Sequence, residues 1–239
     1  MEPKERLIVA LDVDSKAKAM EFARILAPHG SMFKVGMELF YSCGPEIISS
    51  LREKGAGVFL DLKLHDIPNT VSRAVKVLTR YGASIINVHA AGGTEMMKAA
   101  VEAAGEEAGR LGIDRPRIIA VTVLTSIGQR ELNQQLGIKG QIQDLVTYWS
   151  QLAQKSGMDG VVASAREAAA IRNACGEAFI IVTPGIRPAG TAAGDQKRIV
   201  TPSDAIKAGA TYIVVGRPVT AAADPLSAAR QIVYEMQEW

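Results

Sequence analysis

Short apolar runs alternate with longer amphipathic segments along the whole chain, and this alternation restricts the possible folds more than any other feature. The runs are rich in Ile and Val, which is typical of buried parallel strands. The expected strands are Leu7–Leu11, Met32–Val35, Val58–Leu62, Ser84–Val88, Arg117–Val123, Gly160–Ala163, Phe179–Val182 and Tyr212–Val215. The expected helices are Ser15–Leu26, Pro45–Glu53, Thr94–Gly109, Ile142–Lys155, Ala165–Asn173 and Pro225–Met236, with one more beginning at Pro68.

Eight strands alternating with helices predict an α/β protein with a single (β/α)8 TIM barrel, and we expect residues 1–239 to form one domain. No linker-like or low-complexity segment interrupts the pattern. A doubly wound open sheet is the competing fold. We rank it lower because eight near-regular units match barrel closure and no Gly-x-Gly-x-x-Gly turn follows the first strand.

Composition limits the possible partners. A formal net charge of +2 gives no electrostatic reason to expect nucleic acid or an anionic membrane as a partner. The two cysteines, Cys43 and Cys175, have no paired spacing. The first residues lack the apolar core of a signal peptide, and no apolar run is long enough to span a bilayer, so we expect a cytoplasmic protein.

Polar residues recur where the expected strands end. They are Asp12, Lys34, Asp61, Lys63, Asn87, His89, Thr122, Thr125, Ser126, Ser164, Arg187 and Arg217. Catalytic residues of (β/α)8 barrels come from the carboxyl ends of several strands. The repetition from strand to strand therefore predicts a single pocket at that end of the barrel.

The third strand carries Asp61 and Lys63, whose spacing of two residues directs both side chains to the same face of a strand. Charged groups among apolar residues are costly to desolvate unless they neutralise one another. A structural ion pair, with Asp66 favouring the N-terminus of the next helix, explains these residues as well as a catalytic site does. The stretch alone leaves both interpretations open.

Two arginines follow the last two strands, Arg187 beside Gly185 and Arg217 beside Gly216. Loops after these strands commonly bind phosphate in this fold, and a guanidinium matches phosphate oxygens. We therefore expect a phosphorylated small-molecule ligand. The small-residue segment 188–197 suits a lid over the substrate, although an ordinary surface loop has the same composition. No His, Asp, Glu or Cys set has metal-ligand spacing, so we expect no metal.

The motif Asp61-x-Lys63-x-x-Asp66-Ile67-Pro68-Asn69-Thr70 resembles the signature of the orotidine 5′-monophosphate decarboxylase family. Further blocks resemble the same family in the same order, from the first strand to the last. These blocks are Ala10-Leu11-Asp12, Phe33-Lys34-Val35-Gly36, Asn87-Val88-His89-Ala90, Thr183-Pro184-Gly185-Ile186-Arg187 and Val215-Gly216-Arg217-Pro218. The resemblance implies the last step of pyrimidine nucleotide synthesis, in which orotidine monophosphate gives uridine monophosphate and carbon dioxide without a cofactor.

The resemblance also implies a homodimer with shared active sites, in which Lys34, Asp61, Lys63 and the partner subunit's Asp66 form an alternating charge array. The other substrate-binding residues that it implies are Asp12, Ile67, Pro68, Thr70, Thr125 or Ser126, Arg187, Gln196, Gly216 and Arg217. Such an array suits this chemistry, because loss of carbon dioxide leaves a ring carbanion with no adjoining electron sink. Lys63 can stabilise that charge and then supply a proton. Opposite charges about 4 Å apart gain roughly 4 kcal/mol at an effective dielectric near 20, which keeps the lysines charged.

Two other functions fit parts of the pattern. A sister family of metal-dependent sugar-phosphate decarboxylases and aldolases shares the Asp-x-Lys motif but has an acidic metal ligand where this chain has Lys34. A lysine there would repel Mg²⁺. A non-catalytic nucleotide-binding barrel would need the two arginines but would gain nothing from a buried Lys63 between carboxylates.

Overall fold

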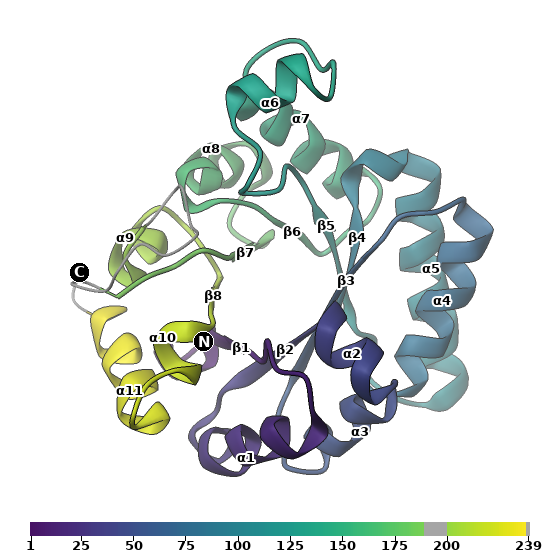
Figure 1. Ribbon diagram of the computed structural model, residues 1–239. Helices are drawn as coiled ribbons and strands as arrows, with labels where there is room; N and C mark the ends of the chain where they lie inside the picture. The colour runs from purple at the N-terminus through teal and green to yellow at the C-terminus, as the bar shows by residue number, and fades with distance from the viewer. Residues whose placement is uncertain (189–199, 238–239) are drawn as a thin grey trace.

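The computed structural model describes residues 1–188 and 200–237. Eight parallel strands follow one another in chain order and close into a barrel, since β1 pairs with both β2 and β8 (Figure 1). The strands are β1 (Leu7–Ala10), β2 (Met32–Gly36), β3 (Val58–Leu64), β4 (Ile85–His89), β5 (Arg117–Val121), β6 (Gly160–Val162), β7 (Ile180–Thr183) and β8 (Tyr212–Val215). The predicted (β/α)8 barrel is confirmed, and closure by β8 excludes the doubly wound sheet.

Helices surround the strands on the outside of the barrel (Figure 1). The α-helices are α1 (Lys16–Leu26), α2 (Met37–Cys43), α3 (Glu46–Arg52), α4 (Pro68–Arg80), α5 (Gly93–Leu111), α6 (Gln129–Gln134), α7 (Ile142–Lys155), α8 (Ala165–Cys175), α9 (Pro202–Lys207), α10 (Arg217–Thr220) and α11 (Pro225–Glu235). Short 3-10 turns cover Pro3–Arg6, Ala27–His29 and Ala90–Gly92. No helix in the described ranges is long and apolar enough to cross a membrane.

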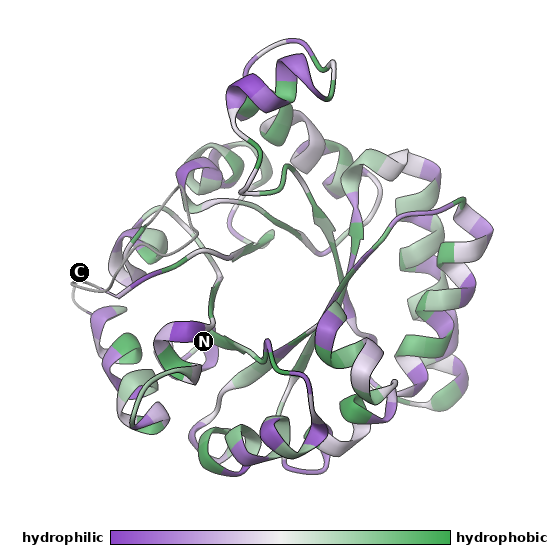
Figure 2. Ribbon diagram, in the orientation of Figure 1, coloured by the Kyte–Doolittle hydropathy of each residue, from purple (hydrophilic) through white to green (hydrophobic). Residues whose placement is uncertain are grey.

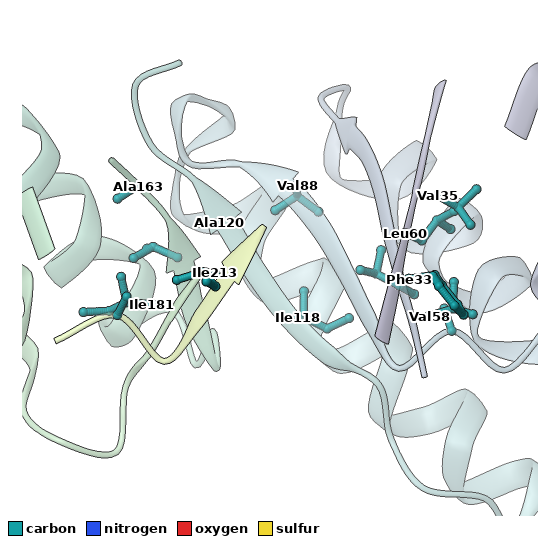
Figure 3. Packing of buried hydrophobic residues seen from close by; sticks show 14 of the residues in the cluster. Phe33, Val35, Val58, Leu60, Val88, Ile118, Ala120, Ala163, Ile181 and Ile213 are labelled. Carbon is teal, nitrogen blue, oxygen red and sulfur yellow. The ribbon is translucent and has the colours of Figure 1, made fainter. Parts of the chain in front are cut away.

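The apolar core has two parts, because successive strand residues point to opposite faces of the barrel wall. Leu7 and Val9 face the helices, whereas Ile8 and Ala10 face the barrel interior. Figure 3 shows part of the outer layer, and much of the strand ribbon in Figure 2 has the green of hydrophobic residues. The interior layer, here called the inner core, comprises Ile8, Ala10, Phe59, Ile85, Ile119, Val182 and Val214. The same alternation directs the next positions along the strands into the mouth of the barrel.

Strand β3 is irregular next to this mouth. Its register against β4 runs from Leu60 opposite Ile86 to Leu64 opposite Val88, so β3 advances four residues while β4 advances two. This is a bulge, and Lys63 lies in it with a left-handed φ of 55°. The expected strand ends at Leu62, whereas β3 continues to Leu64, and the bulge breaks the simple strand alternation assumed for Asp61 and Lys63. Their side chains nevertheless meet inside the barrel.

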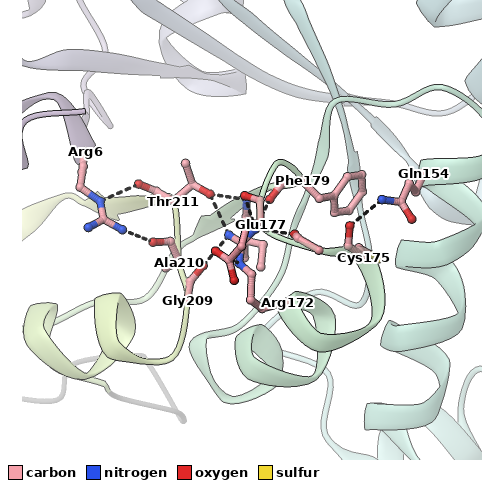
Figure 4. Close-up of polar contacts among 11 residues, drawn as sticks. Arg6, Gln154, Arg172, Cys175, Glu177, Phe179, Gly209, Ala210 and Thr211 are labelled. Carbon is pink, nitrogen blue, oxygen red and sulfur yellow. Dashed lines mark hydrogen bonds and ion pairs between the residues drawn. The ribbon is translucent and has the colours of Figure 1, made fainter.

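The opposite end of the barrel is held by a cluster of arginine hydrogen bonds (Figure 4). Arg172, in the last turn of α8, donates to the carbonyl oxygens of Gly176, Glu177, Phe179 and Gly209 and to the Thr211 hydroxyl. Arg6 donates to the carbonyl oxygens of Ala210 and Thr211. These bonds tie α8 to the segments that enter β7 and β8, so the amino-terminal face carries a stabilising network.

Candidate active site

A cavity of about 210 Å³ opens at the carboxyl ends of the strands, where the sequence predicts a pocket. Lys34 from β2 and Asp61 and Lys63 from β3 line one side. Thr125 and Ser126, in the segment after β5, line another. The remaining lining residues are Phe59, Val121, Val123, Leu124, Val162, Ala163, Pro184 and Val214. The lining thus combines three charged side chains with a larger number of apolar ones.

Four charged residues alternate in sign across this mouth. Lys63 Nζ lies 2.8 Å from Asp61 Oδ1, and Lys34 Nζ lies 3.6 Å from Asp61 Oδ2. Lys34 Nζ also lies 3.0 Å from Asp12 Oδ1, so the order is Asp12, Lys34, Asp61, Lys63. The Lys34 and Asp61 side chains are each 13% exposed and Lys63 is 27% exposed, whereas Asp12 at the rim is 63% exposed. The inner part of the array is therefore shielded from water.

Asp61 is the centre of the array and remains ionised. Burial raises the pKa of its carboxyl, but the charges of Lys34 and Lys63 and hydrogen bonds from Lys63 and Asn87 outweigh that effect. The net result is a pKa below the ordinary value. The carboxylate thus keeps two ammonium groups beside the cavity and neutralises their mutual repulsion.

Asn87 completes the buried part of the site, and the sequence did not single out its role. This residue of β4 is fully buried. Its Oδ1 accepts a hydrogen bond from the Lys63 backbone N–H at 2.8 Å, and its Nδ2 donates to Asp61 Oδ1 at 2.7 Å. The left-handed backbone costs a residue such as Lys63 about 1–2 kcal/mol. The available signal was an amide inside the apolar run Ile85–Val88.

Asp66 and the residues after it do not join the cavity of their own chain. Asp66 is exposed, its Oδ1 accepts a hydrogen bond from the Ile67 N–H at 2.7 Å, and it forms no ion pair with any described residue. Ile67 is 66% exposed, and Pro68 and Thr70 in the first turn of α4 are exposed as well. None of these four residues is among those that line the cavity beside Asp61 and Lys63.

The two arginines predicted to bind phosphate follow β7 and β8, and neither is among the residues that line the cavity. Arg187 is buried, and Arg217 begins α10 directly after Gly216. Burial and the positive charge of Arg217 lower the pKa of Arg187, which reflects two guanidinium groups close together. A Cβ atom on Gly216 would lie 3.5 Å from Asp12 Oδ2, so Asp12 lies beside Gly216. Gln196 and most of the expected lid, residues 189–197, lie outside the described residues.

Two histidines near the mouth, His65 and His89, are the other titratable groups considered as metal ligands. The rings of His65 and His89 lie 5.4 Å apart and are tilted by 40°. Burial and the nearby His65 and Lys63 lower the pKa of His89, which favours the neutral form of that ring. Within residues 1–188 and 200–237, no group of three or more His, Cys, Asp or Glu side chains is arranged to hold a metal ion.

A (β/α)8 barrel with an alternating lysine–aspartate array at its carboxyl mouth defines a barrel enzyme whose functional groups stand at the strand ends. The particular family follows from comparison with known proteins. Residues 5–232 match the model of the family described as orotidine 5′-phosphate decarboxylase / HUMPS, and the chain belongs to this family. The resemblance seen in the sequence is thereby confirmed.

Relatives and solved structures agree with this assignment. The chain is 52% identical to the orotidine 5′-phosphate decarboxylase of Syntrophomonas wolfei over all of both chains. It is 53% identical to the enzyme of that name from Bacillus caldolyticus, covering 95% of this chain and 93% of the relative. The crystal structure of orotidine 5′-phosphate decarboxylase from Lactobacillus acidophilus matches with a TM-score of 0.85 at 38% identity, covering 96% of this chain and 98% of that one.

Proposed function

We propose that this chain decarboxylates orotidine 5′-monophosphate to uridine 5′-monophosphate and carbon dioxide. The observation that carries the proposal is the shielded Lys34–Asp61–Lys63 array beside the cavity. The names of its relatives at about half identity over the full chain support the same reaction. The reaction closes the synthesis of pyrimidine nucleotides.

Lys63 performs the chemical step in this proposal. The bond between ring carbon and carboxylate breaks, and its electron pair stays on the ring carbon as carbon dioxide leaves. The Lys63 ammonium stabilises that charge and transfers a proton from Nζ to the carbon, after which the amine regains a proton from water. Asp61 holds the ammonium in place at 2.8 Å before the reaction. Lys34 and Asp61 supply the remaining charges of the array.

In this proposal, one group of residues binds the ribose and pyrimidine of the substrate and another group binds its phosphate. Asp12 and Lys34 stand where a ribose would contact the rim, and Thr125 or Ser126 contacts the pyrimidine. Arg187, Arg217 and Gly216 hold the phosphate, together with Gln196. The absence of a cofactor and the cytoplasmic location stay predictions of the sequence.

The decisive experiment incubates the purified protein with orotidine monophosphate and a chelator and follows the loss of orotate absorbance. We expect full activity in chelator. Inactivation by chelator with recovery on adding Mg²⁺ would indicate the reaction of the metal-dependent sister family instead.

Lys63→Ala should nearly abolish turnover, whereas Lys98→Ala on α5, an exposed lysine, should not change it. A Lys63→Ala variant within about tenfold of the parent, or 1.4 kcal/mol, would rule out Lys63 as the proton donor.

The proposal includes a homodimer in which Asp66 completes the array of the other subunit. Its support is that Asp66 is exposed, forms no ion pair within the described chain, and is followed by the exposed apolar Ile67. Mixing inactive Lys63→Ala with inactive Asp66→Ala should restore one working site per mixed dimer. If subunits demonstrably exchange and no activity returns, Asp66 acts within its own chain.

A further inference from the structure

Asn87 lies opposite the bulge of β3. It is the residue of β4 between Ile86 and Val88, the two positions where the register with β3 shifts. A bulge disrupts the ladder and leaves backbone groups without their usual strand partners. Here the Asn87 carboxamide takes the place of the ladder, because its Oδ1 accepts from the Lys63 backbone N–H at 2.8 Å.

The same carboxamide also contacts Asp61, the carboxylate that binds the Lys63 ammonium. Nδ2 donates to Asp61 Oδ1 at 2.7 Å, and that oxygen also accepts from Lys63 Nζ at 2.8 Å. The other carboxylate oxygen of Asp61 then faces Lys34. One fully buried side chain therefore contacts the backbone of the proposed proton donor and the carboxylate that holds its ammonium.

The side chain at this position must accept a hydrogen bond from the Lys63 backbone N–H and donate one to Asp61, so it needs an acceptor and a donor side by side. An amide has one of each, and its two partners fix which atom points where. Leucine has nearly the same shape but would leave the buried Lys63 N–H and Asp61 without their partner. An ionised aspartate would accept from Lys63 but oppose Asp61 with a second negative charge.

We infer that Asn87 is a positioning residue for decarboxylation, which holds Lys63 in its left-handed conformation and orients Asp61 between the two lysines. The inference rests on the proposed function and adds to it a residue that is not in the charge array. Asn87 itself does not line the cavity, so it acts through Lys63 and Asp61.

The first test is Asn87→Leu, assayed with orotidine monophosphate beside the parent protein. We expect kcat to fall about a hundredfold, as for a catalytic group displaced by about 1 Å, while binding of uridine monophosphate changes less than about threefold. Ile171→Ala, in the buried core of α8, is the matched control for lost stability and should retain the parent kcat. A kcat for Asn87→Leu within about threefold of the parent overturns the inference. An inactive parent protein would overturn the proposed function instead.

The second test is Asn87→Asp, which keeps the size of the side chain. Its readout is the pH dependence of kcat, which would not change if Asn87 only filled space. The charged groups around this position are Asp61 and Lys63 on β3 and Lys34 on β2. His89 is the titratable residue on β4 itself, and the residue opposite Asn87 on β5 is the apolar Ile119. A protonated acid reproduces the amide pattern, since its C=O accepts from Lys63 and its O–H donates to Asp61. An ionised acid repels Asp61.

We therefore expect the ratio of kcat for Asn87→Asp to that of the parent to fall at least about tenfold as pH rises from about 5 to about 8. The ratio for Asn87→Leu should stay constant over the same range, because leucine does not titrate. A constant ratio for Asn87→Asp overturns the assignment. A crystal structure of Asn87→Leu supplies the check without substrate, and Lys63 with an unchanged positive φ and an unchanged contact to Asp61 would also overturn it.

Discussion

The coupling between Asp61 and Lys63 is the most direct measure of whether the array is held together by charge. The perturbations are Asp61→Asn, Lys63→Met and the double variant. Methionine keeps the unbranched stem in the left-handed backbone and removes only the ammonium. At an effective dielectric near 20, the separations of 2.8 Å to Lys63 and 3.6 Å to Lys34 correspond to gross attractions of about 6 and about 5 kcal/mol.

The net changes in the free energy of unfolding are smaller than these gross attractions. In the unfolded protein the same charged groups interact favourably with water, and that hydration is lost on folding. Asp61→Asn leaves two ammonium groups beside each other in a shielded site, and we expect it to cost about 3–5 kcal/mol. Lys63→Met leaves Asp61 with Lys34 and Asn87, so it should cost less, about 2 kcal/mol. We expect the coupling energy from the double-variant cycle to be about 2 kcal/mol.

The assay is equilibrium unfolding in urea at pH 7 and one protein concentration, followed by far-UV circular dichroism. The pair Lys18–Asp14 is the matched control, since its atoms are 2.9 Å apart but its side chains are 60% and 65% exposed. Its coupling should stay below about 0.5 kcal/mol. Because the pKa of Asp61 is lowered by folding, its contribution is present above about pH 4 and is lost as pH falls through the folded-state pKa. A coupling for Asp61 and Lys63 as small as the control would refute an array organised by charge.

Three further predictions concern residues away from this pair. Arg217→Ala should lower kcat/KM at least about tenfold for orotidine monophosphate but less than about threefold for the nucleoside orotidine, because only the nucleotide carries a phosphate; equal losses would mean that Arg217 supports the fold. Glu107→Gln should remove stability that the parent protein has above about pH 4.5, and the difference should vanish towards pH 2 in acid titrations of unfolding. The reason is that hydrogen bonds from Arg110 and Arg80 lower the pKa of Glu107 to about 2. Arg172→Lys should destabilise the fold by about 3 kcal/mol in urea unfolding while leaving kcat unchanged, because an ammonium cannot reach the acceptors that the planar guanidinium spans.

Most of the barrel was predictable from the sequence because parallel strands covered on both faces appear as short apolar runs. All eight expected strands are present, and α7 begins and ends at the predicted residues. The short helices α2, α6, α9 and α10 were not predicted. They span too few residues for a helical period to emerge, and they are stabilised by the strands and loops around them.

The candidate site was predictable in its residue types but not in its backbone. The Asp61 and Lys63 side chains do meet as predicted, although the backbone between them is not a regular strand. The bulge at Lys63 depends on how β3 pairs with β4, which the sequence of β3 alone does not contain. Asn87 was noted as a polar residue at the end of its strand, but its role was not predicted for the same reason, since that role comes from the two partners that the register brings to it.

The amino-terminal end of the barrel carries a stabilising hydrogen-bond network, and the carboxyl end carries the candidate active site. At the amino-terminal end, Arg172 donates hydrogen bonds to the carbonyl oxygens of Phe179 and Gly209, where the chain enters β7 and β8. At the carboxyl end, Lys63 has a strained backbone and shares Asp61 with a second lysine. Such a site persists only when its surroundings hold it in place. In this chain that support comes from the closed ladder, the inner core beneath the mouth, and one buried amide opposite the bulge.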